Sequence, residues 1–189
     1  MLDLKDTGIL RSAQNDTSSM LLNQQKRYAL PLSALRGYAR NLKRRLRLGK
    51  RDFNICFVDD GAIRRMNALY RGRDRATDVL SFPWGADGGA ILRGRRGRRA
   101  RRADDLAARP DRELEGFLGD VAISVDSARR NARGEGHSTL QEVRWLMLHG
   151  VLHLLGYDHE RDGGEMTALE LALREELGGA AGRGSSRGR

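Results

Sequence analysis

Apolar residues recur at helical spacing in four stretches of the chain. The first predicts a helix over about 31–48, whose apolar side is formed by Leu32, Leu35, Ala39, Leu42 and Leu46. A second amphipathic stretch predicts a helix over about 60–70. A long helix is expected to begin after Ser138, because Ser138 and Gln141 have the spacing of a capping box. The fourth stretch predicts a last helix that begins near Asp162.

Three shorter stretches mix apolar and β-branched residues and predict strands. They lie near 53–58, 78–82 and 119–125, and a short helix is expected after the last of them, around Asp126. Helices and strands do not alternate regularly along the chain. This order argues against a repeated βαβ fold and favours the α+β class.

The pattern fades at both ends and in one internal stretch. Residues 1–25 are polar and weakly patterned, so we expect either a disordered leader or an upstream extension from a misplaced start codon. Residues 85–115 are rich in glycine and arginine without a hydrophobic period, which is typical of a flexible inserted loop. Residues 178–189 predict a disordered tail. A single domain over 26–177 is expected, because 189 residues with 39% hydrophobic positions fit one core.

Composition adds a strong positive charge to this picture. The formal net charge is +10 at pH 7, which favours polyanionic partners such as RNA, although a solvated surface without a partner would carry the same charge. The polar side of the predicted first helix includes Arg40, Lys43, Arg44 and Arg47, which are our candidates for contacts with RNA phosphates. The sequence shows neither an apolar run of about 18 residues nor a secretory signal pattern. We therefore expect a cytoplasmic protein without membrane contact.

Candidate chemistry gathers between residues 149 and 159, which hold three of the four histidines. His149 and His153 lie one helical turn apart, so both rings leave the same side of the predicted long helix. Gly156 can end that helix, and the chain can then turn back and bring His159 to the other two. Three imidazoles with a free fourth position match a catalytic zinc site with one ion per chain, although other first-row ions accept such ligands too. Two histidines at this spacing can also be ordinary half-buried side chains.

Other residue types narrow the kind of metal site. The chain has one cysteine, Cys56, so neither a cysteine-based zinc site nor a disulfide framework can form. In metallopeptidase helices a glutamate follows the first histidine and acts as the general base, but Gly150 occupies that position here. A metallopeptidase-like hydrolase therefore stays an alternative that lacks its usual carboxylate. We interpret His137, which lies outside the run, as a surface or capping residue.

Three stretches resemble one protein family, in the same order. His149–His159 (HGVLHLLGYDH) resembles the three-histidine motif of the YbeY family, bacterial metal-dependent endoribonucleases of rRNA maturation. Tyr70–Pro83 (YRGRDRATDVLSFP) and Leu118–Ser124 (LGDVAIS) are similar to two further segments of that family. The resemblance covers about residues 53–175. Ala76 departs from it, because proline is common at this position in the family.

The resemblance implies a small mixed sheet packed with helices, with the three histidines on a long helix and the loop after it. It also implies a single-strand-specific endoribonuclease that acts in maturation of small-subunit (16S) rRNA and in ribosome quality control. RNA, the small subunit and its assembly factors would be the partners, and the oligomeric state is left open. Arg71 is then expected to stabilise charge on the phosphate. Asp158 is the second catalytic candidate, although aspartate is also a common turn residue.

Several polar residues and one rival function stay open. Glu142 precedes His149 by two helical turns, so we expect it to share the metal-facing side of the helix, either as a partner of a ligand or simply as a surface charge. Asp78, Ser81 and Asp120 lie in the matched strands and could border the cleft. The rival is a ribosome-associated RNA-binding factor with a structural zinc, in which the histidines would only stabilise the turn.

Overall fold

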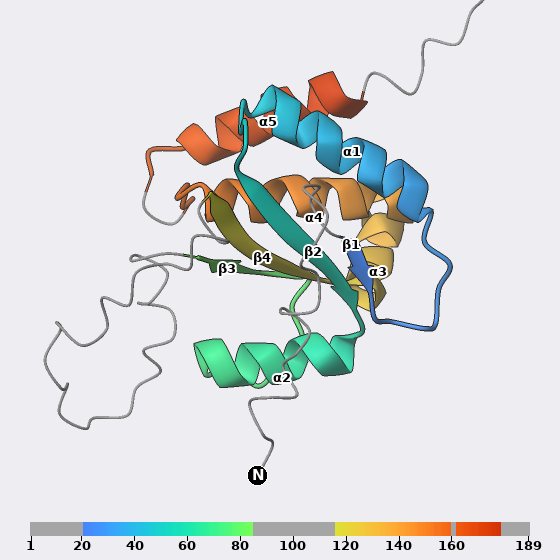
Figure 1. Cartoon of the computed structure of the whole chain (residues 1–189). Helices are drawn as coiled ribbons and strands as arrows, with labels where there is room; N and C mark the ends of the chain where they lie inside the picture. The colour runs from blue at the N-terminus through green and yellow to red at the C-terminus, as the bar shows by residue number, and fades with distance from the viewer. Residues whose placement is uncertain (1–20, 85–115, 160–161, 179–189) are drawn as a thin grey trace, which may run out of the picture.

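The computed structural model describes residues 21–84, 116–159 and 162–178 (Figure 1). The elements along the chain are β1 (Leu21–Asn23), α1 (Leu32–Arg45), β2 (Asp52–Val58), α2 (Asp60–Arg71), β3 (Val79–Pro83), β4 (Phe117–Ser124), α3 (Val125–Glu135), α4 (Thr139–Leu154) and α5 (Glu165–Gly178). Each predicted helix and strand has a counterpart within a few residues. The expected leader up to residue 20, the inserted loop over 85–115 and the expected tail from 179 lie outside the described residues. None of the helices in the described ranges is long and apolar enough to cross a membrane.

Four strands form one mixed sheet in the order β1-β2-β4-β3. β1, β2 and β4 run parallel, and β3 pairs antiparallel with β4. The α+β class with a small mixed sheet is confirmed. β1 is not predicted from the sequence, because a strand of three residues is too short for an alternating pattern to show. Leu21, five residues before the predicted domain boundary at residue 26, is buried and pairs with Ile55.

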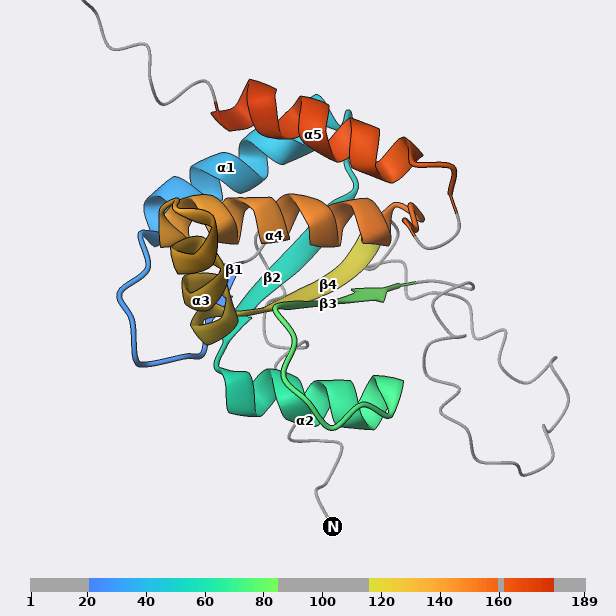
Figure 2. The same ribbon diagram turned by 180° about the vertical axis from the view of Figure 1, so that it is seen from behind.

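Helices cover both faces of this sheet (Figure 2). α1, α4 and α5 lie on one side, and α2 lies on the other. Because successive side chains of a strand point to opposite faces, β2 contributes to two cores. Phe53 and Phe57 belong to the larger core, shared with α1, α4 and α5. Cys56 and Val58 pack with Ile63 of α2 in the smaller core, and Cys56 is thus the small core residue that the sequence predicts.

α4 is the helix that carries the first two histidines, and it is buried between the sheet and the helices above it. Its buried apolar side chains are Val143, Leu146, Met147, Leu148, Val151, Leu152 and Leu154. Its first turn is capped as predicted, because the Ser138 hydroxyl accepts a hydrogen bond from the Gln141 N–H at 3.1 Å. The helix therefore has a fixed start and a fixed depth against the sheet, which together set where its C-terminal end lies.

Candidate metal centre

Three histidines meet at the C-terminal end of α4, as their spacing predicts. His149 and His153 occupy successive turns, with ring centroids 4.7 Å apart. Gly156 has a φ of 92°, a left-handed conformation that glycine adopts without strain, and the chain turns back there. His159 then lies with its ring centroid 5.5 Å from that of His149 and 5.3 Å from that of His153. One potential ligand atom from each residue lies within 4.8 Å of the other two.

Hydrogen bonds fix which ring nitrogen of the two helical histidines faces the centre. Nδ1 of His153 lies 2.9 Å from the Tyr157 carbonyl oxygen, and Nδ1 of His149 lies 3.1 Å from a carboxylate oxygen of Glu170. A carbonyl and an ionised carboxylate can only accept, so each Nδ1 donates its hydrogen. In a neutral imidazole the second nitrogen then carries only a lone pair. The two Nε2 atoms, 3.1 Å apart, therefore turn lone pairs toward each other.

This arrangement fits a bound metal ion. Two facing lone pairs repel each other unless an electron-pair acceptor lies between them. Two ligand nitrogens of a tetrahedral zinc site stand about 3.3 Å apart, since zinc–nitrogen bonds are about 2.0–2.1 Å long. Burial, followed by the neighbouring charge of His149, lowers the pKa of His153 and so favours its neutral, metal-binding form. The cluster could hold zinc or another first-row ion.

Glu170, the residue of α5 that contacts His149, is not among the residues predicted from the sequence. Its carboxylate is buried and shared, with one oxygen at His149 and the other bound by Arg174. Burial raises the pKa of Glu170, but the hydrogen bond from His149 and the charge of Arg174 outweigh burial and lower the pKa overall. A signal was present in the sequence, because Glu170 stands between Met166 and Leu173 on the apolar side of the predicted helix. A carboxylate in that position needs a partner.

The position after the first histidine faces the sheet, not the centre. A Cβ on Gly150 would lie 2.4 Å from Cγ1 of Val121 and 3.3 Å from the hydroxyl oxygen of Ser81. That hydroxyl donates a hydrogen bond to the Gly150 carbonyl at 3.0 Å, so Ser81 holds α4 against β3. The glutamate of metallopeptidase helices cannot occupy this position without displacing the sheet. The geometry therefore gives no support to the peptidase alternative.

The structure places only one of the two catalytic candidates beside the histidines. Asp158 immediately precedes His159, and its charge partly offsets the lowering of the His153 pKa. Arg71 is the last residue of α2, on the opposite side of the sheet from α4 (Figure 2). Its side chain is exposed, and among the described residues no contact joins it to a histidine.

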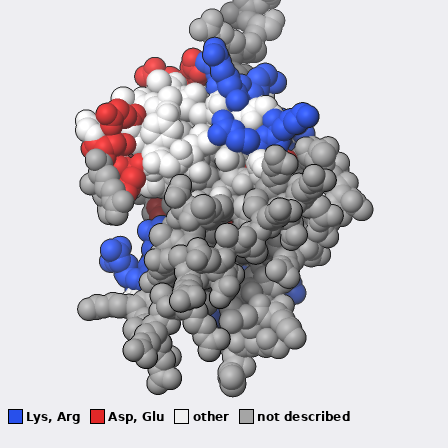
Figure 3. Space-filling view, turned by 60° about the vertical axis from the view of Figure 1, so that its left-hand side comes forward, with Lys and Arg blue, Asp and Glu red and all other residues white. Residues whose placement is uncertain are grey.

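The basic residues predicted for RNA contact differ in their availability. Arg40, Arg44 and Arg47 are exposed. Lys43 is only 19% exposed and pairs with Asp52, with 3.2 Å between Nζ and the carboxylate. On the face shown in Figure 3, basic and acidic side chains occupy separate areas. Three of the four predicted residues are thus exposed to a phosphate, although the Arg44 guanidinium also donates to the Asn41 side chain, and Lys43 is engaged within the protein.

Glu142 lies two helical turns before His149 on the same side of α4, as its spacing predicts, but its carboxylate is not part of the histidine cluster. Its carboxylate lies 3.2 Å from Nε2 of His137, close enough for an ion pair but without hydrogen-bond geometry, and accepts from the Asn131 amide at 3.2 Å. His137 packs against the Trp145 ring with centroids 4.4 Å apart. The fourth histidine is therefore a partly buried packing residue and not a surface residue.

Asp120 lies on the side of the sheet away from the histidines. Strand alternation places it on the same face as Ala122, which packs in the smaller core with α2. Burial raises its pKa to about 6, although a hydrogen bond from the Asn54 amide at 3.0 Å acts in the opposite direction. Asp78, whose role the sequence also left undecided, accepts a hydrogen bond from the Asn131 amide at 3.3 Å. Neither carboxylate is part of the histidine cluster.

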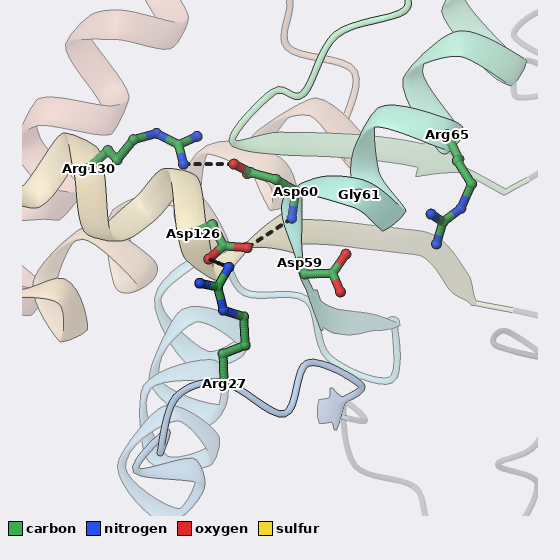
Figure 4. A pocket seen from close by; sticks show the side chains of 7 residues that line it. All are labelled: Arg27, Asp59, Asp60, Gly61, Arg65, Asp126 and Arg130. Atoms are coloured by element: carbon green, nitrogen blue, oxygen red, sulfur yellow. Dashed lines mark hydrogen bonds and ion pairs between the residues drawn. The ribbon is translucent and has the colours of Figure 1, made fainter.

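A second concentration of charge lies where β2 and β4 end and α2 and α3 begin (Figure 4). We call it the aspartate cluster, made of Asp60 and Asp126 with Arg27, Tyr28, Ser124, Ser127 and Arg130. It borders a pocket of about 390 Å³. Asp126 accepts from Arg27, the Tyr28 hydroxyl and the Asp60 N–H, while Asp60 accepts from Arg130 and the two serine hydroxyls. Every oxygen of both carboxylates thus has a donor within the protein.

Known proteins resemble this chain along most of its length. The family model described as endoribonuclease YbeY matches residues 14–178. An endoribonuclease YbeY from Solibacter usitatus is 40% identical over 145 residues, covering 77% of this chain and 78% of that protein. Another from Nautilia profundicola is 39% identical over 130 residues, covering 69% and 75%. A solution structure of a Thermotoga maritima protein shares the fold alone, with a TM-score of 0.53 and 23% identity over 90% of this chain and 98% of that one.

Proposed function

The chain belongs to the YbeY family, and from this premise we propose that it is a metal-dependent endoribonuclease that cleaves single-stranded RNA. The observation that carries the metal part of this proposal is the pair of facing Nε2 atoms on α4, whose Nδ1 atoms are both held by acceptors. The relatives named as endoribonucleases support the reaction type.

His149, His153 and His159 would hold the ion, and zinc is the ion that we expect, one per chain. When bound, such an ion polarises a phosphoryl oxygen and lowers the pKa of bound water. Asp158, beside His159, is proposed to orient a ligand ring or to accept a proton. Arg71 is proposed to stabilise the negative charge on the phosphate of a bound RNA strand, on the side of that RNA away from the histidines. Its guanidinium is exposed and free among the described residues.

RNA phosphates are proposed to contact the exposed arginines of α1 and the turn after it, Arg40, Arg44 and Arg47. Lys43 was also predicted to contact RNA, but its pairing with Asp52 gives it the smallest contribution. Contacts of this kind depend strongly on salt and carry little sequence information. The arginines would therefore supply affinity, while cleavage depends on the histidines.

The proposed biological role is maturation of small-subunit (16S) rRNA and ribosome quality control in the cytoplasm, with the small subunit and its assembly factors as partners. This role rests on the family and not on a contact in the structure. The catalytic unit is proposed to be one domain that runs from β1 to residue 177, with the arginine-rich stretch 85–115 inserted in it.

The first test is cleavage of a single-stranded rRNA fragment by the wild type, His153→Ala and His137→Ala, purified identically. His137→Ala is the matched control, because it removes the one histidine outside the centre. We expect His153→Ala to lose at least about a hundredfold in rate, since a metal ion contributes several kcal/mol to such reactions. His137→Ala should keep its rate per folded molecule.

Equal cleavage by all three proteins would contradict the proposal and leave the rival, an RNA-binding factor with a structural zinc. A duplex of the same sequence and a casein digest complete the experiment. Cleavage of the duplex at an equal rate would overturn the preference for single strands. Digestion of casein that disappears in His153→Ala would revive the peptidase alternative.

A further inference from the structure

Glu170 is a carboxylate in an apolar place. It lies on α5, is 8% exposed, and stands among side chains of the larger core such as Met166 and Leu173. Its two oxygens have different partners, because one meets Nδ1 of His149 on α4 and the other meets the guanidinium of Arg174 on its own helix. The charge is therefore buried at the seam between α4 and α5.

Stability alone does not account for a glutamate at this position. Removing a carboxylate from water is costly, and a well-packed apolar residue of similar size often stabilises a fold as much as a buried ion pair does. Leucine or methionine would join the surrounding core directly. Arg174 does not require Glu170 as an anchor either, since its guanidinium also lies over the Trp145 ring, 4.6 Å from the centroid. What only Glu170 provides is an acceptor for His149.

The neighbouring histidine, His153, also needs an acceptor for its Nδ1 hydrogen, and there the backbone supplies it. Nδ1 of His153 donates to the Tyr157 carbonyl, an acceptor that the chain supplies through the turn at Gly156. His149 lies inside α4, one turn before the helix end, where the nearby carbonyls accept the hydrogen bonds of the helix itself. A side chain from another helix must therefore supply the acceptor. Glu170 is the residue that does so among those the structure describes.

We propose that Glu170 is a positioning residue of the histidine centre, which accepts the Nδ1 hydrogen of His149 and so leaves Nε2 as the metal-binding atom. This inference rests on the proposed function, in which the histidines hold an ion. Arg174 keeps the carboxylate in place from the opposite oxygen. Docking of α5 on α4 is then part of building the metal centre, although α5 contributes no ligand.

The test compares zinc affinity in Glu170→Leu, Glu170→Gln and Glu176→Leu with that of the wild type, by competition of Zn²⁺ with a chelator. Glu176 is the matched control, because it lies on the same helix but forms an exposed ion pair with Arg45. Loss of a partner that orients a ligand histidine typically weakens metal binding about 10–100-fold. We expect that loss in Glu170→Leu, a smaller loss in Glu170→Gln, which keeps a neutral acceptor, and none in Glu176→Leu.

A second measurement detects the positioning itself in the metal-free protein. Nitrogen–proton NMR of the imidazoles distinguishes the two tautomers, and the chain has only four histidines to assign. His149 should carry its proton on Nδ1 in the wild type and shift toward Nε2 in Glu170→Leu, while His153 stays unchanged. A purely structural Glu170 would alter melting temperature without this shift.

The outcomes separate the inference from the proposed function. If the wild type binds no zinc and cleaves without it, the proposed function fails first. If the wild type binds zinc and folded Glu170→Leu binds it equally, with His149 in an unchanged tautomer, Glu170 has no positioning role. Should Glu170→Leu not fold, the zinc affinity of Glu170→Gln decides, since an affinity equal to that of the wild type would overturn the inference.

Discussion

Two polar clusters of this molecule lie toward opposite ends of β4 and differ in what they leave unsatisfied. The aspartate cluster follows the last residue of β4, Ser124. The histidine centre lies toward its beginning, where a Cβ on Gly119 would be 3.0 Å from Leu154 of α4, the residue after His153. The aspartate cluster contains more charged side chains and borders a pocket. The histidine centre consists of two half-buried rings and one exposed ring.

The hydrogen-bond partners assign the two clusters different tasks. In the aspartate cluster each carboxylate oxygen accepts from a donor of the protein, so the network closes on itself and joins the ends of two parallel strands. In the histidine centre the Nδ1 atoms of His149 and His153 are bonded to acceptors, while their Nε2 atoms face each other without a hydrogen between them. Function is therefore indicated by acceptors that the fold leaves without a donor, and not by the density of charge.

Asp126→Ala should have the largest effect that sharpens this comparison, and the effect should fall on stability. The substitution removes the acceptor of the Tyr28 hydroxyl, the Asp60 N–H and Arg27. Breaking a buried polar network in this way costs about 3–5 kcal/mol. Urea denaturation would measure the loss, and a zinc titration at low denaturant should find the affinity of the folded fraction unchanged. A zinc affinity that falls with little loss of stability would reverse the roles of the two clusters.

Gly150→Ala should have an intermediate effect that reaches the histidines through the sheet. Its Cβ would lie 2.4 Å from Val121, so α4 must move away from β4, at a cost of about 1–3 kcal/mol. His149, the preceding residue, would move with it, and zinc affinity should fall as stability does. Gly134→Ala on α3 is the control, since nothing lies within 4 Å of its Cβ, and it should gain stability. Thermal melts with and without Zn²⁺ measure both effects.

The contrast also explains how far the sequence could predict this protein. Periodicity located the helices and strands, because each long element buries one side in a core. It failed for β1, whose three residues show no period, and it extended α1 to 48, where a φ of 50° at Arg47 follows the end of the helix at Arg45. Both failures occur where a few residues depend on tertiary contacts and not on a repeated pattern.

The histidine ligand set was predictable because its members are close in sequence. One turn of helix and one glycine turn bring His149, His153 and His159 together, so spacing alone carries the information. Glu170 was not predictable in the same way, because its contact with His149 depends on how α5 packs against α4. Glu142 has the position on α4 that its spacing predicts, but its carboxylate meets Asn131 of α3 and lies outside the histidine cluster, which spacing alone could not show.

Asp120→Asn should have the smallest effect and tests whether a perturbed pKa by itself marks function. Burial raises the pKa of Asp120 to about 6, above its usual 3.8, so the folded protein holds this proton more tightly than the unfolded chain. Stability contributed by the protonated group is complete below about pH 4 and is lost as pH rises to about 6. The free energy of unfolding of the wild type should therefore fall relative to that of Asp120→Asn across this range, by at least about 1 kcal/mol.

Cleavage separates a structural Asp120 from a functional one. Asp120 is on the α2 side of the sheet and donates nothing to the histidines, so Asp120→Asn should cleave single-stranded RNA within about twofold of the wild type per folded molecule. Denaturation curves at pH 4, 5, 6 and 7 and cleavage rates at pH 7 would measure the two properties on the same preparation. Loss of cleavage in a folded Asp120→Asn would mean that a buried carboxyl that accepts from the Asn54 amide also belongs to the site. Hydrogen-bond acceptors without enough donors would then mark function on the α2 face of the sheet as well as at the histidine centre.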